Sequence, residues 1–105
     1  MKITLSLLIL VRAALYQNTT GSFNTAIGNN ALYSNKGNEK SVAIGHNAMF
    51  YADDRTAGRT AANVAIGYEA LKSATGSNNT TLGYQAGLNI TSGSNNLLLG
   101  YNAQP

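Results

Sequence analysis

The sequence contains no cysteine, so disulfide bonds and thiolate metal sites are excluded. Its only proline is the last of 105 residues, and nothing before it would interrupt a regular stack of strands. Charged residues make up 10% of the chain, whereas roughly 25% is typical of soluble domains. Because amphipathic helices need charged outer faces, this composition argues against a helical fold and favours turn-rich β structure.

The sequence also has few charged side chains and few side chains that could catalyse a reaction. The net charge of +3 comes from basic residues that form no run, which indicates a mildly basic surface and no nucleic-acid partner. The only continuously apolar segment, residues 1–14, is too short to span a membrane, so we expect no membrane insertion by this segment. One histidine and four scattered acids cannot supply a nucleophile, a base and an acid together. We therefore predict no enzymatic activity, no catalytic residue, no metal ligand and no cofactor.

What the sequence does have is an internal repeat. Asn-Thr-Ala-Ile-Gly at residues 24–28 returns as Ser-Val-Ala-Ile-Gly at 41–45 and as Asn-Val-Ala-Ile-Gly at 63–67, with looser copies at 79–83 and 96–100. A recurring string of this kind indicates that each unit is one structural element stacked on its neighbours. The spacing is 16 or 17 residues, except for 22 residues between the second and third copies. Each string ends at a glycine that we expect to turn a corner: Gly28, Gly45, Gly67, Gly83 and Gly100.

Within each string, side chains alternate between the two faces of a short strand. Thr25 and Ile27 share one face, which is β-branched or aliphatic in every copy, so we expect it to form the buried core. The opposite face begins at Ala26 and stays small through the third copy. We expect Ala31-Leu32 and its equivalents to start a second short strand, with leucine or methionine filling the core.

Two short strands and two turns per repeat predict an all-β, parallel β-solenoid of about five coils over residues 14–105. Strands should begin near residues 24, 41, 63, 79 and 96, with no helix longer than two turns. The residue four positions before each glycine is asparagine or serine, which predicts a hydrogen-bonded column along the axis. Residues 1–13 fit either a degenerate first coil, with Ala14-Leu15 in the slot of Ala31-Leu32, or a short, cleavable signal-like segment.

These strings resemble the head repeats of trimeric autotransporter adhesins of the YadA-like type. The longer period, with Ala-Leu-Tyr-Ser-Asn at 31–35 and Thr-Gly-Ser at 75–77, is also similar to repeats of phage tail fibres and related surface proteins. The resemblance covers residues 14–104. It implies a left-handed β-roll with coils of about 17 residues, assembled as a homotrimer.

The same resemblance implies a structural and adhesive segment of a surface fibre or adhesin head that attaches to a host cell or surface. The expected location is extracellular, on a bacterial cell surface or outer membrane or on a virion, and the expected partners are other copies of the chain and a host-surface protein or glycan. A virion tail-fibre shaft is the alternative. The thin core of one chain and the small face at Ala26, Ala43 and Ala65, which would let chains approach closely, favour a homotrimer as well.

Two other solenoid classes fit less well. Residues 27–32 match the hexapeptide pattern of β-helix acyltransferases, but those enzymes stack three hexapeptides per coil and this chain has one per repeat. An ice-binding solenoid needs an unbroken threonine column, which Val42, Val64 and Leu97 interrupt here. The single histidine, His46, occupies a corner position that holds tyrosine in later copies, so we interpret it as a surface residue.

Two features are candidates for recognition. Three corner tyrosines should form an exposed ladder, which is either structural stacking or a strip that binds a glycan or a partner. The 22-residue repeat should hold an outward loop within residues 50–60, either a tolerated bulge or a recognition element. Removing Asp53 to Ala57 would restore the 17-residue period. The candidate surface contacts are Asp53, Asp54, Arg55, Arg59, Tyr68, Tyr84 and Tyr101.

Overall fold

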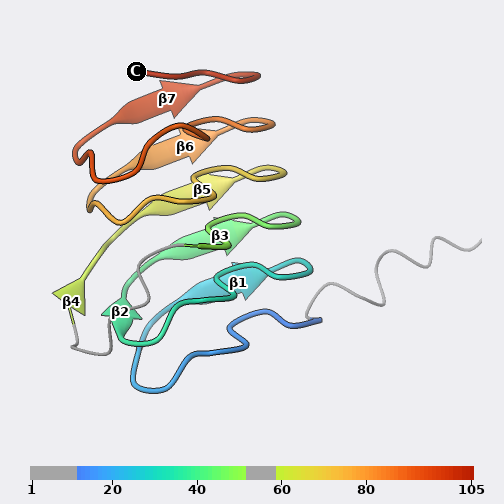
Figure 1. The fold of residues 1–105 in the computed structure, drawn as a ribbon, viewed down its shortest axis with the longest axis vertical. Coiled ribbons are helices and arrows are strands. Elements are labelled where there is room, and N and C mark those ends of the chain that lie inside the picture. The colour runs from blue at the N-terminus through green and yellow to red at the C-terminus, as the bar shows by residue number, and fades with distance from the viewer. Residues whose placement is uncertain (1–11, 52–58) are drawn as a thin grey trace, which may run out of the picture.

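The computed structural model describes residues 12–51 and 59–105, and within these ranges the chain is a parallel β-solenoid without a helix (Figure 1). One five-stranded sheet holds all five repeat strings, and its strands lie in sequence order, each parallel to the next. The predicted fold class is therefore confirmed, and each strand begins one residue after the predicted position. The strands of this sheet are β1 (Thr25–Ile27), β3 (Val42–Ile44), β5 (Val64–Ile66), β6 (Thr80–Leu82) and β7 (Leu97–Leu99).

The glycine after each strand makes the corner. These glycines have φ between 111° and 139°, a region that L side chains rarely adopt. Successive corners also lie too close together for a side chain, since a Cβ at Gly45 would lie 2.6 Å from the Gly67 carbonyl oxygen. Glycine is therefore required at this position for two reasons, the positive φ and the close approach of the next coil.

The prediction of which strand face is buried was wrong. Ala43, Ala65 and Thr81 point into the solenoid and are 0% exposed, whereas Ile27 and its equivalents lie on the outside of the sheet. The reason is the space across the coil, which is already filled from the opposite side by long side chains. These are Leu32, Met49 and Leu71, all fully buried, as the sequence predicted for core fillers. Only a small residue fits on the strand facing them.

The predicted second strand at Ala31-Leu32 is also absent, because this side of each coil consists of hydrogen-bonded turns. Leu32, Met49 and Leu71 have φ of 52°, 53° and 48°, which is incompatible with an extended strand. The coils are nevertheless joined here, since the Leu32 amide donates to the Ala48 carbonyl at 3.0 Å and the pattern repeats coil by coil. Instead, β2 (Asn38–Glu39) and β4 (Arg59–Thr60) form a small second parallel sheet.

The predicted polar column forms inside the stack. Its side-chain oxygens accept hydrogen bonds from the backbone amide of the equivalent residue in the next coil, as from Asn79 N–H to Asn63 Oδ1 at 2.9 Å. The Asn63 amide nitrogen donates sideways to the Gly76 carbonyl at 2.8 Å, which holds the connecting loop against the strand. In the middle of the column these bonds satisfy side chains that are almost fully buried, those of Ser41, Asn63 and Asn79. The column consists of Asn24, Ser41, Asn63, Asn79 and Asn96.

Residues 12–17 hydrogen-bond to the coil that follows them. The amides of Leu15 and Gln17 donate to the carbonyls of Ala31 and Tyr33, each at 3.0 Å, in the alignment that places Leu15 in the slot of Leu32. Residues 1–11 lie outside the described ranges, so the choice between a first coil and a signal-like segment stays a prediction.

The long repeat keeps the strands on either side of it in register. Asn38 pairs with Arg59, 21 positions later, and Val42 pairs with Val64, 22 positions later. One extra residue is therefore absorbed between β4 and β5, where the Glu39 carbonyl accepts from the amides of both Ala61 (3.1 Å) and Ala62 (3.3 Å). The other four extra residues precede β4.

Candidate functional site

The outward face of the five-stranded sheet carries mainly aliphatic side chains. Its residues on the central strands are half-buried, and exposure is higher toward both ends of the sheet, with 38% at Ile27, 50% at Leu82 and 67% at Leu97. A contiguous apolar face rimmed by polar residues is typical of an interaction surface. We call it the outer face; it consists of Thr25, Ile27, Val42, Ile44, Val64, Ile66, Thr80, Leu82, Leu97 and Leu99.

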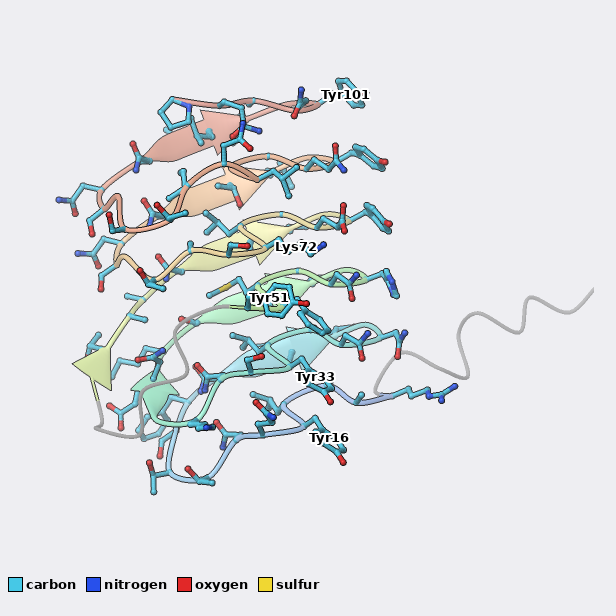
Figure 2. All side chains as sticks on the ribbon, viewed as in Figure 1. Tyr16, Tyr33, Tyr51, Lys72 and Tyr101 are labelled. Carbon is cyan, nitrogen blue, oxygen red and sulfur yellow. The ribbon has the colours of Figure 1, made fainter. Side chains whose placement is uncertain are left out.

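A stack of rings lies at the corner just beyond the strand ends, where Figure 2 labels Tyr101 on the last coil. The ring centroids of His46, Tyr68, Tyr84 and Tyr101 are 5.5, 5.1 and 5.5 Å apart in order, and neighbouring planes differ by only 12–17°. The Asn29 amide continues the row, with Nδ2 3.3 Å from His46 Nδ1. This corner ladder brings together three of the sequence-predicted contact residues, and His46 is the surface residue that its position indicated.

Backbone hydrogen bonds fix the ladder in place. The carbonyls of His46, Tyr68 and Tyr84 each accept a bond from the next coil, as His46 does from Glu69 N–H (2.9 Å) and Tyr84 does from Asn102 N–H (2.8 Å). The donor residue sits in the left-handed region, with φ of 56° at Glu69 and 51° at Asn102. Each coil therefore sets the position of the ring below it.

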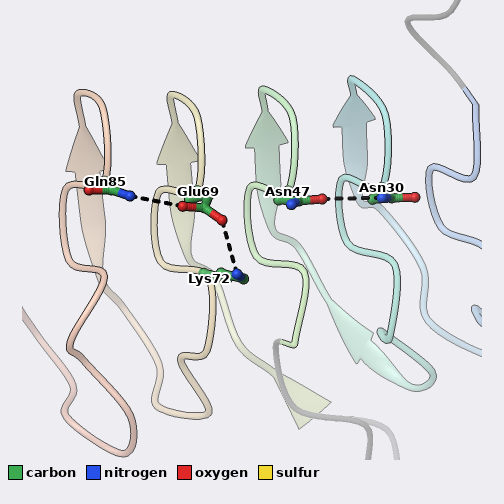
Figure 3. Close-up of polar contacts among 5 residues, drawn as sticks. All are labelled: Asn30, Asn47, Glu69, Lys72 and Gln85. Carbon is green, nitrogen blue, oxygen red and sulfur yellow. Dashed lines mark hydrogen bonds and ion pairs between the residues drawn. The ribbon is translucent and has the colours of Figure 1, made fainter.

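A row of polar side chains lies two residues after the corner glycines, and Figure 3 shows four of them, Asn30, Asn47, Glu69 and Gln85. Gln85 Nε2 donates to Glu69 Oε1 at 2.9 Å, and Lys72 Nζ contacts Glu69 Oε2 at the same distance. The bonds from Gln85 and Lys72 lower the pKa of Glu69, and the Glu69 carboxylate raises the pKa of Lys72. Asn30 donates to Asn47 at 3.2 Å farther down the row. The carboxylate is therefore held as a paired anion, which suits a structural link rather than proton transfer.

A second ring column on the other side of the coil was not anticipated from the sequence. Tyr16, Tyr33 and Phe50 stack with centroids 5.0 and 4.8 Å apart, and Tyr51 packs edge-on against Phe50 at 4.4 Å. Lys72 Nζ lies 6.0 Å from the centroid of the Tyr51 ring. The available signal was an aromatic residue five positions after two of the glycines, with Tyr16 one period earlier.

The loop candidates cannot be placed with the ladder. Arg59 opens β4 in the small second sheet, and Asp53, Asp54 and Arg55 lie outside the described residues. Elsewhere the described chain encloses no pocket and groups no set of three or more metal-ligating side chains. Nor do residues 12–51 and 59–105 contain a helix long and apolar enough to cross a bilayer.

Comparison with models of known protein families finds no match, and neither the curated proteins nor the solved structures contain one significantly similar to this chain.

Proposed function

We propose that this chain is a non-catalytic, structural and adhesive segment of an extracellular surface fibre or adhesin head that attaches to a host cell or surface. A regular rod of stacked coils is suited to spacing and display, and its exposed features are an apolar face and a ring ladder. The resemblance to adhesin-head repeats supports a bacterial cell surface or outer membrane. A virion tail-fibre shaft remains the second candidate, favoured by the similarity of the longer repeat to tail-fibre repeats.

The outer face is the observation that carries this proposal, because it supports assembly into a homotrimer. The small alanine face, from which close chain packing was predicted, is enclosed within the coil and cannot meet another chain. The outer face is uncharged, and its rows repeat with the strand spacing of about 4.8 Å. A second copy presents the same rows at the same spacing, so aliphatic side chains of one can interdigitate with those of the next along the whole rod. Three copies around one axis follow from the resemblance to trimeric heads.

Sedimentation at several concentrations tests the assembly. We expect the wild-type chain to sediment as a trimer and Ile66→Asp, on the outer face, to sediment as a folded monomer. Ser92→Asp is the matched control, because Ser92 lies exposed on a connecting loop away from that face, and it should remain trimeric. A wild-type chain that is a folded monomer down to micromolar dilution contradicts the proposed assembly.

Attachment is tested separately, by binding of the labelled chain to cells and to arrayed glycans. The candidate contacts for this step are the corner tyrosines and the loop residues Asp53, Asp54, Arg55 and Arg59. A variant lacking Asp53 to Thr56 should retain the fold and lose binding if the loop recognises the target. Unchanged binding by that folded variant removes the loop from the proposal and leaves the ladder.

A further inference from the structure

The corner ladder presents a regular row of free hydroxyl groups. Tyr68 and Tyr84 each have a ring stacked on both faces, so solvent reaches their edges and hydroxyls, and they are 41% and 46% exposed. The three tyrosine hydroxyls make no hydrogen bond to the described residues, and each can both donate and accept. Tyr101 stacks on Tyr84 and is 79% exposed, so its hydroxyl also reaches solvent.

The row is rigid before anything binds. Backbone bonds from the next coil, at 2.8–2.9 Å, hold the carbonyls of His46, Tyr68 and Tyr84. A tyrosine side chain has only two rotatable torsions, and stacking restricts them further. Little conformational entropy therefore remains to be lost when a ligand lies along the row.

The chemistry beside the ladder favours a neutral ligand. The parallel row in Figure 3 offers amide groups, and its single carboxylate, Glu69, is already engaged by Lys72 and Gln85. Phosphate-rich polymers are held mainly by arginine and lysine, which this row does not offer apart from the paired Lys72. Hydroxyls, amides and ring edges together are suited to a polyhydroxylated, uncharged molecule.

Spacing decides the kind of polymer. Successive rings are 5.1–5.5 Å apart. An extended polypeptide advances about 3.3 Å per residue, and a DNA strand advances about 3.4 Å per nucleotide, so the rise per unit of neither matches the ring spacing. An extended β-1,4-linked hexose polymer advances by close to one coil spacing per sugar. Its consecutive sugars are turned over relative to one another, but each presents hydroxyl groups to the row.

We propose that the corner ladder binds an extended, neutral, β-1,4-linked polysaccharide lying parallel to the solenoid axis. Successive sugars hydrogen-bond to the hydroxyls of Tyr68, Tyr84 and Tyr101. This inference rests on the proposed adhesive function, since it names the class of ligand that the rod would attach to.

Calorimetric or NMR titration with cellohexaose and chitohexaose tests the inference, and maltohexaose is the matched control ligand. Maltohexaose contains the same sugar as cellohexaose, but its α-linkages make a curved chain that cannot follow a straight ladder. We expect binding of the two β-linked oligomers, tightening with length up to the extent of the ladder, and little binding of maltohexaose. Equal binding of cellohexaose and maltohexaose overturns the spacing argument.

Conservative variants locate the site. Replacing both Tyr68 and Tyr84 by phenylalanine keeps the ring stack and removes two hydroxyls, which should weaken binding about 3- to 10-fold per hydroxyl. The same double replacement at Tyr16 and Tyr33, in the other ring column, should leave the affinity unchanged. An effect of the control pair alone, or no binding by the folded wild-type chain, refutes the inference.

Sedimentation of the same samples separates this inference from the proposed assembly. A trimer that binds neither β-linked oligomer overturns the ligand class and leaves the assembly standing. A monomer that binds them overturns the assembly and leaves the ladder site standing.

Discussion

Two adjacent residues on β3 should respond oppositely to the same replacement. Ala43 points into the coil and is 0% exposed, with Ala26 and Ala65 directly below and above it in the sheet. Ile44 points outward and is half-buried. We therefore expect Ala43→Asp to unfold the chain and Ile44→Asp to leave a single chain folded. Sequence reasoning from the aliphatic pattern alone predicts the reverse, because it places Ile44 in the core.

The magnitudes follow from burial. An aspartate at position 43 would bury an uncompensated carboxylate, which costs at least about 3–5 kcal/mol and is comparable to the whole stability of a small domain. Overlap with the packed interior adds to this cost. Replacing Ile44 removes only part of the transfer free energy of one isoleucine, on the order of 1 kcal/mol in a monomer. In a trimer built on the outer face, Ile44→Asp would in addition place a charge in the interface.

Urea unfolding followed by circular dichroism at a series of protein concentrations separates these effects. Ala43→Asp should show no folded signal at any protein concentration, because its defect arises within one coil. The loss in Ile44→Asp, measured against wild type, should shrink as dilution dissociates the wild-type trimer. An Ala43→Asp chain with nearly wild-type stability, or an Ile44→Asp monomer that fails to fold, would refute the assignment of the two faces.

Three further predictions concern single side chains. Gly67→Ala should lower the melting temperature sharply, because φ is +134° and a Cβ would overlap the Gly83 carbonyl, whereas an alanine at an exposed loop position should have little effect. Lys40→Asn should raise stability by on the order of 1 kcal/mol in urea unfolding, because Lys40 has φ of 64° and asparagine adopts that region more readily. The pKa of Glu69 is lowered in the folded chain, so the stability that Glu69 contributes should be present above about pH 4.5 and fall as the pH drops through that lowered pKa. The Glu69→Gln variant should lack this contribution, so its melting temperature should fall less than that of the wild type between pH 6 and pH 3.

The strand positions could be predicted because each rests on a local requirement. Only glycine can make the corner after the strand, and alternation over three residues identifies the two faces. Alternation does not say which face is inside, and preference for aliphatic burial gave the wrong answer here. The deciding quantity is the volume of the side chain that reaches across the coil, which belongs to a residue six positions farther along the chain.

The sequence does contain a related signal, because the size of the inward strand residue and the size of the residue six positions later vary in opposite directions. Where the inward strand residue is alanine, as at Ala43, the residue across the coil is large, as at Met49. In the fourth copy the inward strand residue is the larger Thr81, and the residue across the coil is Gly87. A Cβ at Gly87 would lie 3.0 Å from the Thr81 methyl. Complementary sizes in the first four copies indicate which face is inside, whereas the fifth copy, with Leu98 and Gln104, does not follow this pattern.

The turns on the far side could not be predicted, because their backbone contradicts local preference. Leu32 and Met49 adopt a left-handed conformation that is uncommon for such residues. They are held there by hydrogen bonds to the next coil and by burial of their side chains, neither of which a single repeat reveals. For the candidate site, the corner ladder follows from the repeat spacing, whereas the second ring column lies outside the repeated string and was missed.

The register around the long repeat predicts how much of the loop can be removed. Four of its five extra residues precede β4, and the fifth is the doubled residue at Ala61, next to Ala62, within the stack. Deleting Asp53 to Thr56 should therefore leave Arg59 paired with Asn38 and shift stability by less than about 1 kcal/mol, since loop length has a weak effect. Deleting Asp53 to Ala57 restores the 17-residue period but leaves the connection one residue short. The small sheet must then slip by one position, which turns its side chains to the opposite face.

Thermal melting of the two deletions, with hydrogen exchange at the Ala61 and Ala62 amides, compares them directly. Equal stability, with both amides still protected in the longer deletion, would show that the doubled residue is not fixed in the stack.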